Sequence, residues 1–167
     1  MKATDLLQDQ LESSKLLTAT LLADMQDAPL TSPTPKGGNH PLWIAGHVVY
    51  AEARITHELM FDKPSPLADW NELFRGGSQP LDDASQYPLT IPEALAMWDK
   101  IRTGTLAILA GFSDEDLDRP VANCPPGREA MFGTFGKALS MVAMHPLNHR
   151  GQVADARRVL GRKPLLA

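Results

Sequence analysis

The sequence predicts an all-α protein, a four-helix bundle with long connections. Four stretches of about 20 to 27 residues repeat apolar side chains at three- and four-residue steps, which is the pattern of one helix face. No stretch alternates apolar and polar residues between turn signals, as a half-buried strand would. Helices of this length are typical of four-helix bundles, and we expect a single domain over residues 1–167.

The first predicted helix covers residues 4–25, and a loop rich in proline follows over residues 28–38. The second predicted helix starts at Pro41, because proline suits the first helical position and pushes the preceding residue out of helical geometry. His40 is therefore the predicted N-cap of this helix, which extends to about residue 61.

A connection of residues 62–90 separates the second and third helices. A connection this long in a small domain is usually functional or wraps around the body. It also allows the two helices that it joins to be other than antiparallel. We expect a turn or two of helix near residues 67–74. The third predicted helix begins at Thr90, with a capping box to Glu93, and ends at Gly111.

The fourth predicted helix runs from Thr134 to Leu160, where Gly161 stops it. Pro146 lies in its middle, where a proline removes a backbone hydrogen bond and costs about 3 kcal/mol. We expect a kink here. Two interpretations stay open: a π-bulge of the kind that marks functional sites, or a tolerated kink without a role.

The composition excludes several classes of protein. Hydrophobic residues make up 43% and charged residues 22%, as in globular domains, so a disordered chain is excluded. The net charge is −4 and the sequence has no long run of Lys and Arg, so a nucleic-acid-binding protein is not expected. The single cysteine allows no intrachain disulfide, and no run of about 20 apolar residues is present to cross a membrane. The amphipathic start lacks a signal-peptide pattern, so we expect a cytoplasmic protein.

Three histidines share the inward faces of two predicted helices. His145 and His149 are four residues apart, which places both rings on one helix face, where they can bind one metal ion. Both lie within the apolar stripe of the fourth helix, and His47 lies within that of the second. Burying imidazole rings without hydrogen-bond partners costs stability, and one divalent metal ion bound by all three rings supplies the missing partner. Three protein ligands leave an open position, as catalytic sites require.

The alternative is that the three histidines are core residues bonded to backbone or to neighbouring polar groups. Gln152, close to one turn beyond His149, is expected to hydrogen-bond a ligand imidazole, unless another helix satisfies it. Trp43 either lines the pocket or packs in the core, and we favour the core. Glu52 either orients a ligand, acts as a proton acceptor or faces solvent, and we favour solvent. No residue is predicted to be catalytic.

The segment His145-Pro-Leu-Asn-His149-Arg-Gly-Gln152-Val resembles the C-terminal HxxxHxGQ signature of the DinB-like superfamily. Residues 40–47, His-Pro-Leu-Trp-Ile-Ala-Gly-His, resemble its second-helix motif, in which a Trp precedes a Gly-His pair. The resemblance extends over nearly the whole chain and implies a four-helix bundle. It also implies a divalent metal, nickel or zinc in many members, held by three histidines that map to His47, His145 and His149. The sequence departs from the motif at Pro146.

The resemblance further implies a homodimer. Characterised relatives include S-transferases that use low-molecular-weight thiols and a maleylpyruvate isomerase, and many members are described as metal-dependent hydrolases. Our first hypothesis is a metal-dependent enzyme that activates a thiol or water against a small electrophilic substrate. The second is a non-catalytic, stress-related bundle that binds a metal or ligand. The third is an interaction module whose histidines are packing residues.

Overall fold

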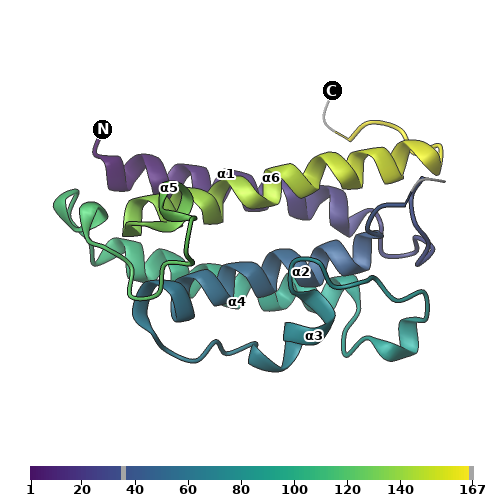
Figure 1. The fold of residues 1–167 in the computed structure, drawn as a ribbon. Helices are drawn as coiled ribbons and strands as arrows, with labels where there is room; N and C mark the ends of the chain where they lie inside the picture. The colour runs from purple at the N-terminus through teal and green to yellow at the C-terminus, as the bar shows by residue number, and fades with distance from the viewer. Residues whose placement is uncertain (35–36, 166–167) are drawn as a thin grey trace.

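The computed structural model describes residues 1–34 and 37–165, and this part of the chain is all-helical, as predicted. Residues 35, 36, 166 and 167 of the expected domain lie outside the described ranges. The long helices, which Figure 1 shows packed as a bundle, are α1 (Ala3–Ala23), α2 (Pro41–Arg54), α4 (Ile91–Ala110) and α6 (Phe135–Val159). Across the described ranges, β-type pairing is confined to two isolated bridges. None of the helices described there has the length and apolar character needed to cross a bilayer.

The helices α1 and α6 run in one direction, and α2 and α4 run in the opposite direction (Figure 1). The consecutive helices α2 and α4 are therefore parallel, which their long connection permits. This connection contains η2 (Ala68–Trp70), α3 (Asn71–Phe74) and η3 (Ala84–Gln86), so the short helix expected near residues 67–74 is confirmed. Phe74 at the end of α3 is fully buried and anchors the connection to the bundle.

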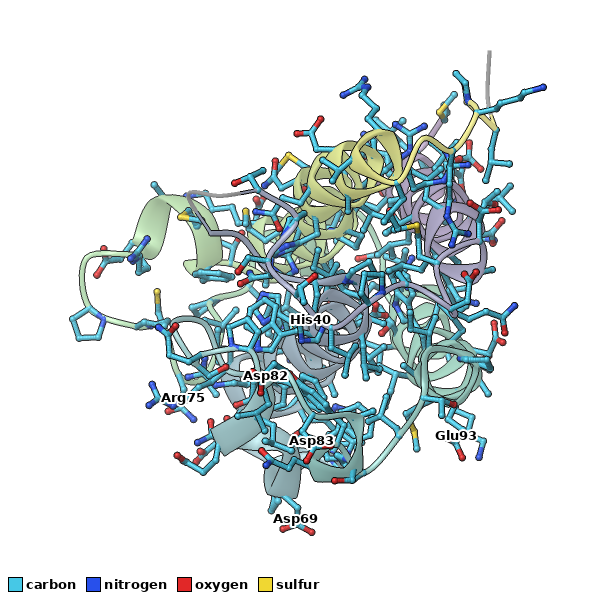
Figure 2. All side chains as sticks on the ribbon, turned by 90° about the vertical axis from the view of Figure 1, so that its right-hand side faces the viewer. His40, Asp69, Arg75, Asp82, Asp83 and Glu93 are labelled. Carbon is cyan, nitrogen blue, oxygen red and sulfur yellow. The ribbon has the colours of Figure 1, made fainter. Side chains whose placement is uncertain are left out.

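Two of the long helices, α2 and α4, begin at their predicted capping residues. His40 caps α2, because its Nδ1 accepts a hydrogen bond from the backbone N–H of Trp43 at 3.2 Å. Thr90 and Glu93 form the capping box of α4, and Thr134 caps α6. Figure 2 looks at the end of the bundle where α2 and α4 begin. His40 lies inside this end, and Glu93 lies at its periphery.

Pro146 does not interrupt α6, which is a continuous α-helix from Phe135 to Val159. The π-helical turn lies instead in η1 (Ile55–Leu59), which extends α2. The interpretation of Pro146 as a π-bulge is therefore wrong. Pro146 is buried, and Thr18 of α1 donates a hydrogen bond from Oγ1 to its carbonyl oxygen at 3.2 Å. Packing against α1 thus holds this part of α6 in helical geometry despite the missing N–H.

The core is divided along the bundle into two apolar clusters with a polar layer between them. One cluster surrounds Trp98 near the start of α4, and the other surrounds Leu109 near its end. The polar layer consists of buried side chains at middle positions of the helices, namely Ser14, Thr18, His47, Glu52, Arg102 and Thr105. Burying polar groups costs stability unless they are paired. A layer of them in the middle of the core therefore marks a candidate functional site.

Candidate metal centre

The side chains of His47 on α2 and of His145 and His149 on α6 meet in the middle of the bundle. The Nε2 atom of His145 lies 3.1 Å from Nε2 of His47 and 3.1 Å from Nε2 of His149. One ligand atom from each residue lies within 4.8 Å of the other two. Two nitrogens bound tetrahedrally at about 2.1 Å to one ion are about 3.4 Å apart. The structure therefore brings the three predicted ligands to a spacing that fits one metal ion.

Neighbouring oxygens fix the proton positions on two of the rings. Nδ1 of His47 lies 2.7 Å from the carbonyl oxygen of Phe74, and Nδ1 of His149 lies 2.9 Å from Oε1 of Gln152. These oxygens only accept hydrogen bonds, so both Nδ1 atoms carry the proton and both Nε2 atoms present a lone pair. A cation between the rings satisfies both lone pairs, whereas a single proton on Nε2 of His145 would serve only one of them. The donor set thus fits a metal ion.

Burial keeps the three imidazoles neutral. It lowers the pKa of His47 to about 4, although the hydrogen bond to the Phe74 carbonyl acts in the opposite direction. Burial, followed by repulsion from the charged forms of His149 and His47, lowers the pKa of His145 to about 3. Burial also lowers the pKa of His149. Since neutral imidazole is the form that binds metals, all three ligands are available at neutral pH.

Gln152 hydrogen-bonds a candidate ligand, as predicted, because its amide oxygen holds the ring of His149. Trp43 is 3% exposed, and its ring stacks on that of His47 at 4.5 Å between centroids and 12° between planes. The indole Nε1 donates to the carbonyl of Leu73 at 2.9 Å, which fixes the ring from its other end. Trp43 is thus a core residue, as favoured, and it also orients a candidate ligand.

Glu52 neither joins the histidines nor faces solvent, so it is neither a group that orients a ligand or accepts a proton at the site nor the favoured solvent-facing carboxylate. It is 3% exposed, and its carboxylate forms an ion pair with Arg102 at 2.7 Å. It also accepts hydrogen bonds from Trp98 Nε1 and Thr105 Oγ1, both at 2.7 Å. An offset of five residues turns Glu52 about 140° around α2 from His47, toward α4 instead of α6. The sequence analysis missed Arg102, because nothing local to α4 distinguishes a buried arginine from an exposed one.

A cavity of about 410 Å³ opens beside the histidines and is lined by both His47 and His145. Its polar side chains other than these are Tyr50, Arg54 and Arg128. The rest of the wall is mainly apolar and consists of Ala51, Ile55, Leu59, Gly76, Pro125, Met131, Phe132 and Met141. Apolar walls with a few polar groups and strongly shifted histidines are typical of a small-molecule site.

Several of these lining residues come from segments in which the sequence identified no individual site residue. Gly76 belongs to the long connection, and Pro125 and Arg128 belong to the loop before α5 (Glu129–Phe132). The carbonyl of Phe74 comes from the same connection. Backbone groups and isolated loop residues carry no periodic pattern, so the only available signal was the unusual length of the connection.

Comparison with known families agrees with this geometry. The family model described as the DinB superfamily matches residues 10–153, a range that contains the three histidines and Gln152. The comparison with curated proteins finds no match.

Proposed function

Because the chain belongs to the DinB superfamily, we propose that it is a metal-dependent enzyme in which His47, His145 and His149 hold one divalent ion, nickel or zinc. The observation that carries this proposal is the convergence of three Nε2 atoms, two of which have their lone pairs fixed toward the shared centre. When bound, such an ion supplies a Lewis acid that lowers the pKa of a coordinated water or thiol toward neutrality.

The protein's own groups prepare the site for this chemistry. The Phe74 carbonyl and the Gln152 amide hold His47 and His149 in the tautomer that binds metal, and Trp43 fixes the plane of His47. The largely apolar cavity beside His47 and His145 receives a small electrophilic substrate and limits the access of bulk water.

The lining of the cavity favours thiol transfer over hydrolysis. Hydrolysis benefits from a general base near the attacking water, and a carboxylate or a histidine is the usual base. Among the described residues that line the cavity, there is no carboxylate and no histidine other than the candidate ligands. A low-molecular-weight thiol that ionises at the metal needs no further base. We therefore propose thiol S-transfer as the first reaction to test and hydrolysis as the second.

Elemental analysis of the untagged protein, purified without chelators, tests the metal site. We expect about one nickel or zinc ion per chain in the wild type and loss of the ion in His149→Ala. His57→Ala is the matched control, because His57 lies outside the cluster and hydrogen-bonds the Ala53 carbonyl of its own helix. Absence of metal in the wild type, even after reconstitution, would refute the proposal.

Cobalt substitution then separates an enzyme from a non-catalytic metal-binding bundle. A small thiol that reaches the metal changes the visible spectrum of the cobalt protein, as an open coordination position predicts. A spectrum that does not respond to any thiol or to pH would favour a closed, structural site. Turnover assays with thiol-plus-electrophile pairs and with activated esters decide between the two reactions.

We also propose that the protein is a homodimer. The neighbouring helices α1 and α6 expose the apolar side chains of Leu16 (68%), Met144 (51%) and Leu147 (43%), which supports a partner on this face. Light scattering coupled to size exclusion tests the proposal, and a strict monomer at micromolar concentration would contradict it.

A further inference from the structure

A second cavity, of about 220 Å³, lies at the end of α6 and shares no lining residue with the cavity beside the histidines. Its wall contains four arginines and four apolar residues. They are Arg150, Arg157, Arg158 and Arg162, with Leu21, Ala154, Pro164 and Leu165. Figure 1 shows the end of α6 and the tail that follows it at the same end of the bundle as the end of α1. The protein as a whole has a net charge of −4, so this concentration of positive charge is local.

Carboxylates balance only part of this charge. Three of the arginines are ion-paired: Arg157 with Asp24 at 2.9 Å, Arg158 with Asp155 at 2.5 Å, and Arg162 with Asp24 at 3.4 Å and with Asp27 at 2.5 Å. Arg150 forms no ion pair within residues 1–34 and 37–165. Within the described residues, four guanidinium groups thus face three carboxylates, and one positive charge has no ion-pair partner there.

Arg150 is also the residue with an unsatisfied buried donor. Over the part of the chain that the structure describes, its Nε is the one buried side-chain nitrogen or oxygen without a hydrogen-bond partner. Leaving a donor of a charged group unpaired and buried costs stability, so native structures rarely contain one without a reason. A ligand that accepts hydrogen bonds at this point removes the cost.

The helix dipole does not account for the arrangement. Cations in the last turn of a helix stabilise its negative end, and Arg157 and Arg158 lie in the last turn of α6. Arg150 lies nine residues before Val159, the last residue of that helix, which is beyond the reach of this effect. The stability of α6 therefore does not require an arginine at position 150.

We propose that this cavity binds a phosphate-type oxyanion and that Arg150 is its principal donor. The planar guanidinium fork matches the paired oxygens of such an anion, and several arginines around one cavity form a typical phosphate site. The cavity holds the volume of roughly seven water molecules, which is enough for a phosphate group. The anion is either free phosphate or the phosphate end of a small ester.

Calorimetric titration of the full chain with inorganic phosphate, at constant ionic strength in chloride, tests this inference. We expect saturable binding at millimolar phosphate or below and a rise in the unfolding temperature with phosphate concentration. Arg150→Gln should weaken binding at least about tenfold, which corresponds to about 1.4 kcal/mol. The matched control is Arg119→Gln, an exposed arginine outside the cavity that pairs with Asp116, and it should bind phosphate like the wild type.

A further variant guards against misfolding of Arg150→Gln. Arg158 is 77% exposed at its side chain, so Arg158→Gln removes a charge from the cavity with little effect on packing, and it should also weaken binding. Methyl phosphate that binds as well as inorganic phosphate identifies an ester as the ligand, and preference for inorganic phosphate identifies the free anion. Absence of saturable binding, or equal affinity in Arg150→Gln and the wild type, would overturn the proposal.

The histidine site does not enter this inference. Chelator-treated and metal-loaded protein should bind phosphate equally well, because the two cavities have no residue in common. Phosphate binding that disappears on metal removal would place the anion at the histidines and refute the proposed site.

Discussion

Gly46→Ala should damage the candidate metal centre without changing any residue that contacts the metal. A Cβ atom at position 46 would lie 2.2 Å, 2.4 Å and 2.5 Å from three ring carbons of Phe74. Real Cβ atoms do not approach other carbons so closely, and Phe74 is fully buried, so its ring has no free space to enter. The ring must shift, and the backbone of Phe74 shifts with it. The carbonyl of this residue is the group that holds Nδ1 of His47.

Two opposing terms set the change in stability. Overpacking a core costs about 1–3 kcal/mol, and replacing a mid-helix glycine with alanine returns about 1 kcal/mol of helix propensity. We therefore expect a net loss of up to about 2 kcal/mol, which lowers the unfolding temperature by about 4–8 °C for a domain of this size. Displacing the carbonyl partner of a ligand histidine typically costs about 10–100-fold in metal affinity. Thermal unfolding and chelator competition measure the two effects separately.

Gly104→Ala is the matched control. Gly104 also lies within a helix, but a Cβ there meets no atom within 4 Å, so this variant should gain up to about 1 kcal/mol and keep its metal. The double variant Gly46→Ala/Phe74→Leu removes the clash and retains the backbone carbonyl, so it should recover metal affinity. Gly46→Ala protein with the unfolding temperature and metal affinity of the wild type would refute the reasoning about Phe74.

Three further predictions concern the groups around the centre. Gln152→Leu should lower metal affinity about 10–100-fold in chelator competition while leaving the fold intact, since it removes only the acceptor that orients a ligand ring; an unchanged affinity would contradict this role. Arg102→Met should cost about 3–5 kcal/mol in urea unfolding, because it leaves Glu52 charged and buried, and adding Glu52→Gln should recover part of that loss. Metal-free protein should lose stability as the pH falls below about 6.5. The folded state holds the pKa of His47 at about 4 and that of His145 at about 3, so below pH 6.5 these histidines bind protons in the unfolded chain but not in the folded protein. At pH 5 the loss is about 2 kcal/mol for each ring, and a stability independent of pH between 7 and 5 would contradict it.

The fold could be predicted from the sequence because local signals and global packing agree over the long helices. His40, Thr90 and Thr134 mark where three of these helices begin; His40 and Thr90 make the predicted caps, and Thr134 caps the helix predicted to start there. Pro146 is the exception. Its intrinsic preference opposes a mid-helix position and favours a π-bulge there, but α6 stays α-helical where Pro146 is buried against α1 and its carbonyl accepts the hydrogen bond from Thr18.

The three candidate ligands could be predicted for a related reason. A histidine within an apolar stripe buries polar ring nitrogens, which costs stability unless they have partners. One cation can serve as the partner of all three histidines on the two helices. Gln152 could be predicted from its helical spacing to His149. The Phe74 carbonyl could not, because it reaches His47 from a segment 27 residues away with no periodic pattern.

Glu52 shows why composition and spacing alone misassign charged core residues. Its partners Trp98, Arg102 and Thr105 all lie on α4, on the opposite side of α2 from the histidines. The sequence of α2 alone could not place Glu52 in a buried ion pair, because only the positions of α4 and α6 around α2 separate its surroundings from those of His47. The buried ion pair and the histidine cluster therefore occupy one polar layer and have different functions. The pair joins α2 to α4 at a cost in desolvation. On the other side of α2, His47 and the histidines of α6 converge on a position that a metal ion fits.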